Sequence, residues 1–246
     1  MAAGFAGNKH RVEAADAWLL HSYPYKETSL IIDVVSRDYG RVSLVARGAR
    51  RPMSALRGCL MAFQPLSLSW FGAGELKTLH AAEWQGGVPQ LNGLPLICGF
   101  YLNELLLKLL PHDDPHDRLF QAYDQAVRRL AHPRCEVEPI LRIFELSLIR
   151  ELGYGFALDR DANGHPIAPD ARYQFIGERG LLPVVDRANP GESSLVGSTL
   201  LNMAAGRFDD PQTAVQAKQM MRTLLGGLLG DTPLHTRKLL RDLHRL

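Results

Sequence analysis

Short apolar runs separated by turn signals fill the first 85 residues of the chain. They cover residues 15–22, 28–35, 41–46, 66–70 and 75–81. In the fourth run apolar and polar residues alternate strictly, which places Leu66, Leu68 and Trp70 on the core-facing side of a strand. Five short strands with a long connection, residues 48–65, after the third predict a five-stranded OB-type barrel. An SH3-like barrel or an open meander fits this spacing less well.

The hydrophobic period becomes helical after Gly93. Helices are predicted over residues 94–110, 114–131, 138–153, 194–204, 211–229 and 233–244. On the third of these, Leu141, Phe144 and Leu148 form the apolar stripe, and Arg142 and Glu145 lie away from it. Glycines and prolines surround residues 172–176, which predicts a loop or a short hairpin there.

The pattern therefore predicts an α+β chain with two domains. Residues 1–85 form the barrel domain, and residues 86–246 form a mostly α-helical domain with an irregular insert at about 153–190.

Composition favours an ordinary globular protein. The chain has 246 residues, of which 22% are charged and 46% hydrophobic. Its three cysteines, Cys59, Cys98 and Cys135, are far apart and form no CxxC pair, which argues against a disulfide scaffold and for a reducing compartment. No apolar run approaches the ~18 residues of a membrane span. Residues 1–16 read as a short leader without the apolar core of a signal peptide. We expect a cytoplasmic protein.

Charge is segregated along the chain. The formal net charge is only +2, yet residues 36–60 hold six arginines against Asp38 alone, whereas residues 86–190 hold 11 basic and 14 acidic residues. Clustered guanidinium groups favour phosphate because each can bond two of its oxygens at once. A solvated loop that keeps the protein soluble is the alternative. A second basic cluster (Arg237, Lys238, Arg241 and Arg245) lies near the C-terminus.

The motifs of several enzyme classes are absent. The sequence holds no GxGxxG, no GxxxxGK[ST], no GxSxG and no HExxH. The best enzymatic candidate is a metal-dependent phosphodiesterase or nuclease using His112, Asp113, His116 and Asp117. The alternative, which we favour, is a polar loop between helices in which Asp113 or Asp114 caps the next helix.

Five ordered passages carry a resemblance to a known family. They are residues 40–51 (Gly-Arg-Val-Ser-Leu-Val-Ala-Arg-Gly-Ala-Arg-Arg), 27–34 (Glu-Thr-Ser-Leu with Asp33-Val34), 75–79 (Glu-Leu-Lys-Thr-Leu), 101–106 (Tyr-Leu-Asn-Glu-Leu-Leu) and 142–155 (Arg-Ile-Phe-Glu-Leu with Leu-Gly-Tyr-Gly). In order and spacing they resemble the RecO family of bacterial recombination mediators, over residues 15 to about 155. The resemblance implies an N-terminal OB domain followed by a helical domain.

The resemblance also implies a function. It indicates a non-enzymatic DNA repair protein that binds single- and double-stranded DNA and anneals complementary strands. With RecR it would help load RecA onto single-stranded DNA coated with single-strand binding protein (SSB). We expect no cofactor, no membrane and no small-molecule substrate, and a place at the nucleoid in the bacterial cytoplasm. An adaptor whose barrel contacts only proteins is a further alternative.

Candidate site residues follow from charge and resemblance together. The DNA-binding candidates are Arg41, Arg47, Arg50, Arg51, Arg57 and Lys77. Tyr39 is the exposed ring that we expect, although a plain turn residue is the simpler interpretation. For the acidic C-terminal tail of SSB we expect Arg142, with Leu119 and Leu105 as walls of an apolar pocket or, alternatively, as ordinary core leucines.

One departure from the family concerns zinc. Many relatives carry four cysteines just after the Gly-Tyr-Gly motif, but residues 153–190 contain no cysteine. We expect no structural zinc there and a segment held by packing alone.

Overall fold

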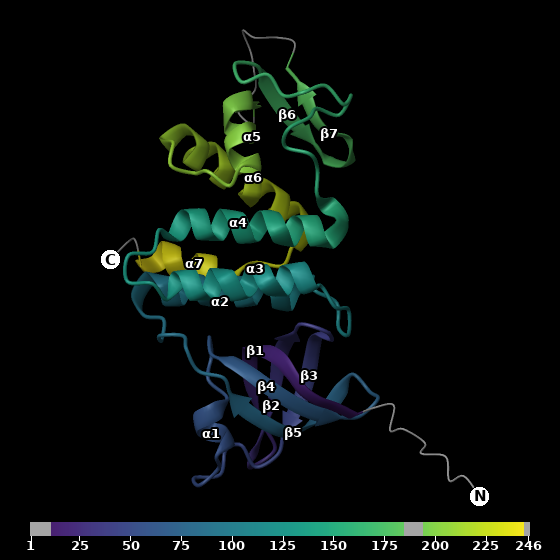
Figure 1. Ribbon diagram of the computed structural model, residues 1–246, viewed down its shortest axis with the longest axis vertical. Helices are drawn as coiled ribbons and strands as arrows, with labels where there is room; N and C mark the ends of the chain where they lie inside the picture. Colours follow the sequence, from purple (N-terminus) through teal and green to yellow (C-terminus); the bar gives the residue numbers. More distant parts are fainter. Residues whose placement is uncertain (1–10, 185–193, 244–246) are drawn as a thin grey trace, which may run out of the picture. The chain divides into compact units, whose positions relative to one another are not determined.

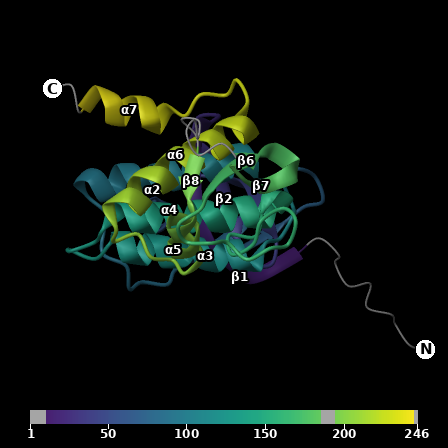
Figure 2. The ribbon, with the colours of Figure 1, turned by 90° about the horizontal axis from the view of Figure 1, so that it is seen from above.

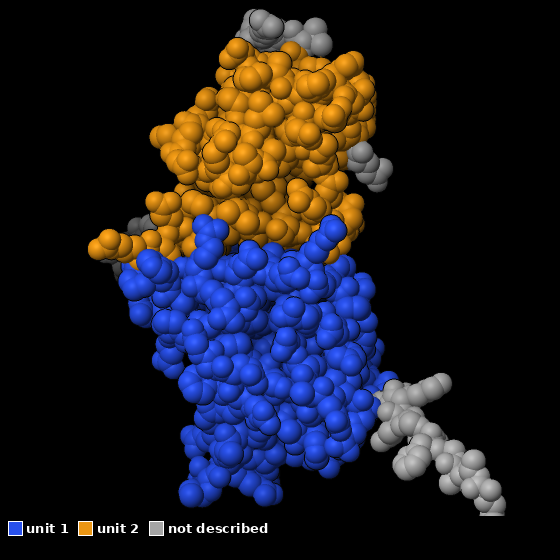
Figure 3. Space-filling model, viewed as in Figure 1, with its two compact units in different colours: residues 1–133, 234–246 blue, residues 134–233 orange. Residues whose placement is uncertain are grey.

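The computed structural model describes residues 11–184 and 194–243. The chain folds into two compact units, residues 1–133 with 234–246 and residues 134–233 (Figure 3). Of the leader predicted at residues 1–16, residues 1–10 lie outside the described part, and residues 11–16 already belong to the first strand.

The barrel belongs to the first unit (Figure 1). Its elements are β1 (Arg11–Tyr25), β2 (Ser29–Ser36), β3 (Gly40–Ala46), the short helix α1 (Leu56–Cys59), β4 (Pro65–Phe71) and β5 (Leu76–Trp84). The strands close in the order β1-β2-β3-β5-β4, with parallel pairing of β3 to β5. Leu66, Leu68 and Trp70 all lie in the buried core, as their alternation predicts. The α+β class and the OB-type barrel are thus confirmed.

Three helices complete the first unit. They are α2 (Gly93–Leu109), α3 (Asp117–Leu130) and α7 (His235–Leu243). Trp18 of β1 packs edge-to-face against Tyr123 of α3, with ring centroids 5.8 Å apart. Asn103 of α2 joins both elements, since its amide donates to Leu20 O at 2.8 Å and its Oδ1 accepts from the Tyr123 hydroxyl at 2.5 Å. The two helices are therefore tied to the barrel by a buried polar link as well as by rings.

The second unit combines helices with a small sheet. It contains α4 (Val137–Ile149), a π-helical turn η1 (Arg150–Tyr154), β6 (Arg172–Ile176), a 3₁₀ turn η2 (Gly177–Arg179), β7 (Gly180–Pro183), β8 (Ser194–Val196), α5 (Gly197–Ala204) and α6 (Pro211–Leu229). The strands form a sheet in the order β7-β6-β8 (Figure 2). The helix predicted to begin at residue 194 begins at Gly197, because residues 194–196 pair with β6.

The segment 153–184 is held by more than packing, which corrects our expectation. Strand pairing of β6 with β7 and β8 supplies backbone hydrogen bonds. Asp161 organises the preceding turn by accepting from the backbone N–H groups of Asn163 and His165 at 2.8 and 2.9 Å.

The boundary predicted near residue 85 stays a prediction. The compact units place α2, α3 and α7 with the barrel. Within residues 11–184 and 194–243, no helix is long and apolar enough to cross a membrane.

Candidate nucleic-acid interface

Four arginines are concentrated on the segment that follows β3, which we call the arginine loop (residues 47–57). Arg47, Arg50, Arg51 and Arg57 are all exposed. Backbone hydrogen bonds shape the loop, since Arg50 N donates to Thr28 O at 2.8 Å and Arg51 N to Gly48 O at 3.0 Å. Gly48 has φ +69°, a left-handed conformation that suits glycine, and the Arg51 side chain lies against it. The arginines are therefore presented from an ordered turn.

The charge of the arginine loop is not neutralised within the described residues. None of its four arginines forms an ion pair with a described carboxylate. The sequence explains this, because residues 39–74 contain no aspartate or glutamate. Exposed guanidinium groups without a carboxylate partner among the described residues are available for an external anion such as phosphate.

An apolar groove accompanies these charges. It has a volume of about 350 Å³, and Leu30, Ala49, Leu56 and Leu60 line it between Arg50 and Arg57. Such a groove offers apolar contact to a ligand whose anionic groups lie on the two flanking guanidiniums.

Lys26 contacts the arginine loop, a contact that the sequence pattern does not predict. It lies in the turn between β1 and β2, and its carbonyl oxygen accepts from Arg50 Nη1 at 3.4 Å. Its ammonium group lies 5.2 Å from the centroid of the Tyr25 ring. No local signal links the two segments, because their contact depends on the register of the β1–β2 hairpin.

Arg41 and Lys77 have partners inside the protein, and their assignment to the DNA surface stays a prediction. Arg41 Nη1 donates to the carbonyl oxygens of Leu107 and Leu110, at 2.5 and 3.3 Å, where α2 ends. Lys77 Nζ lies 2.6 Å from Asp113 Oδ1, and its side chain is only 12% exposed. Both cations thus bind the end of α2 and the loop after it, whereas the four arginines of the arginine loop are exposed.

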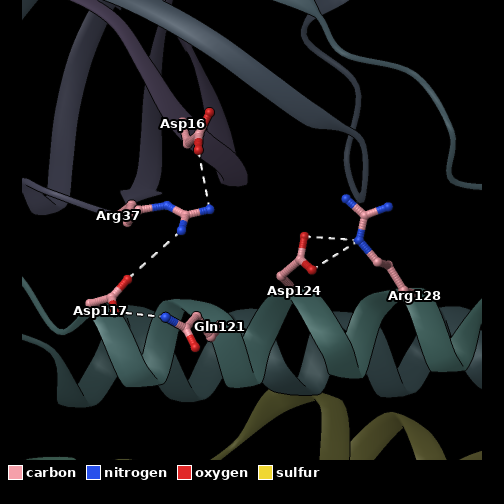
Figure 4. Close-up of polar contacts among 6 residues, drawn as sticks. All are labelled: Asp16, Arg37, Asp117, Gln121, Asp124 and Arg128. Carbon is pink, nitrogen blue, oxygen red and sulfur yellow. Dashed lines mark hydrogen bonds and ion pairs between the residues drawn. The ribbon is translucent and has the colours of Figure 1, made fainter.

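Arg37, at the opposite end of β2 from the arginine loop, is also occupied. Its guanidinium group points to Asp16 of β1 at 3.2 Å and to Asp117 of α3 at 4.0 Å (Figure 4). It also lies 5.1 Å from the centroid of the Phe120 ring. Tyr39 nearby is 40% exposed and packs its ring edge-to-face on Trp70.

The loop of His112 to Asp117 does not assemble a metal site among the described residues. No group of three or more His, Cys, Asp or Glu side chains there could hold an ion. Asp113 binds Lys77, and Asp114 lies 3.4 Å from His116. Neither aspartate caps α3, whose N-cap residue is His116, and this corrects our capping expectation. The polar loop instead joins the barrel to the helices.

The residues predicted to bind the SSB tail belong to two compact units. Leu105 and Leu119 are buried core residues of the first unit, so they offer no accessible surface. Arg142, in the second unit, is only 11% exposed and pairs at 2.9 Å with Glu145, which is fully buried rather than on the polar edge. The buried face of α4 is therefore wider than the apolar stripe that the sequence pattern predicts.

A groove of about 540 Å³ lies beside Arg142. Its apolar part consists of Val137, Pro139, Phe208 and Ala214. Its rim carries the carboxylates of Glu136, Glu138 and Asp209 together with Lys218, which pairs with Glu138 at 2.7 Å. The Nε atom of Arg142 is buried without a hydrogen-bond partner among the described residues.

Within residues 153–184, no group of three or more His, Cys, Asp or Glu side chains could hold a metal ion. Asp161 and His165 are two possible zinc ligands in this segment, and their side chains lie 3.4 Å apart. Both contacts between these residues belong to the turn already described. Tetrahedral structural zinc needs four ligands, usually thiolates or imidazoles.

Fold and surface together define an OB-barrel protein with a basic loop and an appended helical part, and the comparisons with known proteins agree. The family model described as "Recombination protein O N terminal" matches residues 12–87, and that described as "Recombination protein O C terminal" matches residues 91–238. The chain therefore belongs to the RecO family of DNA repair proteins.

Full-length relatives support this. The DNA repair protein RecO of Azoarcus sp. (strain BH72) is 51% identical over 241 residues, which cover 97% of this chain and 99% of that protein. The RecO protein of Nitrosospira multiformis is 50% identical over 240 residues, with coverages of 97% and 99%. That of Chromobacterium violaceum is 50% identical over 241 residues, with coverages of 96% and 97%. Membership of this DNA repair family is consistent with a recombination mediator role.

Proposed function

We propose that this protein binds single- and double-stranded DNA through the arginine loop and anneals complementary strands. The observation that carries the proposal is the set of four exposed arginines without a carboxylate partner among the described residues. Guanidinium groups contact phosphates, which every nucleotide carries, so binding would be independent of sequence. Annealing needs this indifference because both complementary strands must be held in turn.

Family membership supports the wider role that we propose. In it the protein works without catalysis of its own and, with RecR, helps RecA to replace SSB on single-stranded DNA at the nucleoid. Its contribution would be to hold the displaced strand and bring partners to it.

We also propose that the C-terminal tail of SSB docks in the groove beside Arg142. The apolar part of the groove and the unpartnered Nε of Arg142 support this. The three carboxylates on the rim oppose an acidic tail, so docking would depend on Arg142 and on release of Lys218 from Glu138.

The experiment that tests these proposals is annealing of fluorescently labelled complementary oligonucleotides. The strands are coated with full-length SSB or with SSB that lacks its C-terminal tail. We expect the protein to anneal naked strands and to anneal SSB-coated strands only when the tail is present. R47A/R50A/R51A should lower the annealing rate roughly tenfold or more in both cases.

Variants separate the two surfaces. R142Q/E145Q removes both charges of the buried pair together, so no carboxylate is left uncompensated in the core. It should anneal naked DNA normally but fail to anneal SSB-coated strands even when the SSB tail is present. E145Q alone should still anneal SSB-coated strands when the tail is present. Annealing that R47A/R50A/R51A leaves unchanged would contradict the DNA-binding proposal. Tight protein binding without retention on DNA would favour the adaptor.

A further inference from the structure

Trp84, the last residue of β5, is an exposed aromatic ring held in a fixed position. It is 56% exposed, whereas Trp18 and Trp70 are each 1% exposed. Its indole N–H donates to Gln64 Oε1 at 2.9 Å. Gln64 is itself buried and donates to Val88 O at 3.0 Å, which locks the acceptor in place. The ring thus has little freedom to lose when a ligand packs on it.

The register of the barrel explains why so large a ring is exposed. Leu68 pairs with Ala82 and Leu66 pairs with Trp84, so Trp84 continues the core-facing series. The strand ends there, however, and Gly86 in the following turn passes along the benzo edge of the indole. The N–H and one edge of the ring contact the protein, and 56% of the residue remains exposed to a ligand.

Trp84 lies on the strand that α1 contacts. The helix α1, which carries Arg57, packs against β5 (lower left in Figure 1). Burial first and the charge of Glu83, the residue before Trp84, second raise the pKa of the Cys59 thiol in α1. The exposed ring thus belongs to the strand that packs against the helix carrying Arg57.

We propose that Trp84 is a stacking platform for an unpaired base of single-stranded DNA whose phosphates lie on the arginine loop. Base–aromatic stacking combined with a basic surface is the general means of holding single strands without reading their sequence. Because the indole N–H already bonds Gln64, the ring has no free donor with which to discriminate between bases. This inference rests on the proposed DNA binding and adds selectivity for unpaired strands.

Stacking suits annealing for a geometric reason. A base that stacks by its face keeps its Watson–Crick edge free, so a complementary strand can pair with it while it is held. Bases inside a duplex are already stacked on their neighbours and offer no free face. The arginines alone bind both forms through phosphate, whereas Trp84 would favour the single strand.

Intrinsic fluorescence tests the proposal on the unmodified protein. Trp18 and Trp70 are buried, so quenching by acrylamide reports mainly on Trp84. Adding an oligothymidylate should quench the emission and protect the remainder from acrylamide. A duplex of the same length should do neither. In W84F the response to the oligothymidylate should disappear.

Affinity measurements complete the test. W84L should weaken single-strand binding about fivefold to a hundredfold, as expected for loss of one stacked base, and leave duplex binding within about twofold. L94A removes an exposed apolar residue of α2 and should change neither affinity. Thermal melting checks that W84L and W84F are folded.

The outcomes separate this inference from the proposed function. If wild-type protein binds both DNA forms, loses both in R47A/R50A/R51A, and shows no response of Trp84 to single strands, the stacking role is overturned and DNA binding stands. If a protein partner shields Trp84 from acrylamide and single-stranded DNA does not, the stacking role is likewise overturned. If wild-type protein binds neither DNA form, both proposals fail.

Discussion

At the scale of single residues, Glu104 shows how one buried carboxylate fixes the end of the chain. Its oxygens accept from the backbone N–H groups of His235 and Thr236 at 2.8 and 3.0 Å and from the Thr236 hydroxyl at 2.7 Å. These N–H groups are the free donors of the first turn of α7, which a carboxylate satisfies well. A helix that follows the whole second unit along the chain is thereby attached to α2.

The contacts of Glu104 make a prediction about pH. Burial alone would raise the pKa of Glu104, but the hydrogen bonds from Thr236 and His235, with Lys108 adding to them, lower it to about 2. The ordinary value is 4.5, so this carboxylate stabilises the fold fully above about pH 4.5. The contribution falls as the pH drops and is lost as the pH passes through about 2.

We therefore expect E104Q to be less stable than wild type by roughly 2 kcal/mol at pH 7. The difference between the two proteins should shrink between pH 4.5 and 2. Urea unfolding at several pH values measures it. A difference independent of pH over that range would contradict the role of the charge.

Arg142 and Glu145 make a second prediction at this scale. Their pair is almost fully enclosed, and R142A removes the cation that lies 2.9 Å from a fully buried carboxylate. R142A should lower the free energy of unfolding by about 3–5 kcal/mol, whereas R142Q/E145Q should lower it much less. Thermal melting of the two variants distinguishes a buried structural pair from an exposed anion site. Equal melting temperatures for R142A and wild type would show that the pair has no structural role.

At the scale of elements, arginines of the same sequence block divide into two kinds. Arg41 lies on β3 and binds the carbonyl oxygens at the end of α2, where a cation also interacts favourably with the helix dipole. The arginines of the arginine loop follow β3 directly and are exposed, and among the described residues none of them pairs with a carboxylate. One block of arginines therefore supplies both a contact that packs the barrel against α2 and an exposed positively charged loop.

This division predicts opposite phenotypes. R41A should destabilise the protein by roughly 2 kcal/mol and leave the Kd for DNA within about twofold. R47A/R50A/R51A should melt near the wild-type temperature and bind DNA much more weakly. Melting temperatures and binding titrations on both variants give the comparison. Loss of DNA affinity in folded R41A would place Arg41 on the DNA surface.

The elements themselves were predictable because their signals are local. Strict alternation over residues 66–70 gives β4, and helical spacing of leucines gives α2. What the pattern could not show were contacts between segments far apart in sequence. Arg41 meets α2 carbonyls 66 and 69 residues away, and Arg50 meets Lys26 across the barrel register. The charge of an arginine does not show whether its side chain binds another segment of the protein or is exposed on the surface.

Burial was harder to predict than secondary structure for the same reason. Glu145 is spaced as a polar residue of α4, yet the protein buries it completely beside Arg142. Trp84 sits on the core-facing register of β5, yet it is exposed because the strand ends there. In both cases the packing of other elements, not the local pattern, determines whether the side chain meets water.

At the scale of the whole molecule, positive charge in a nearly neutral chain is concentrated on the arginine loop. The net charge of +2 gives little general attraction to DNA. Residues 39–74 lack any carboxylate, however, so the field near the arginine loop is positive. Binding driven by such a surface releases counterions from the nucleic acid and weakens as salt increases.

The slope of that salt dependence is the last prediction. If four arginines each neutralise one phosphate, a plot of log K against log salt for single-stranded DNA should have a slope of about −3. R47A/R50A/R51A leaves Arg57 and should have a slope of about −0.7. For W84L the binding constant should be lower than that of wild type at every salt concentration, but the slope should be the same, because stacking releases no counterions. Fluorescence anisotropy of labelled oligothymidylate between low and moderate salt measures all three lines, and an unchanged slope in the triple variant would place the phosphate contacts elsewhere on the protein.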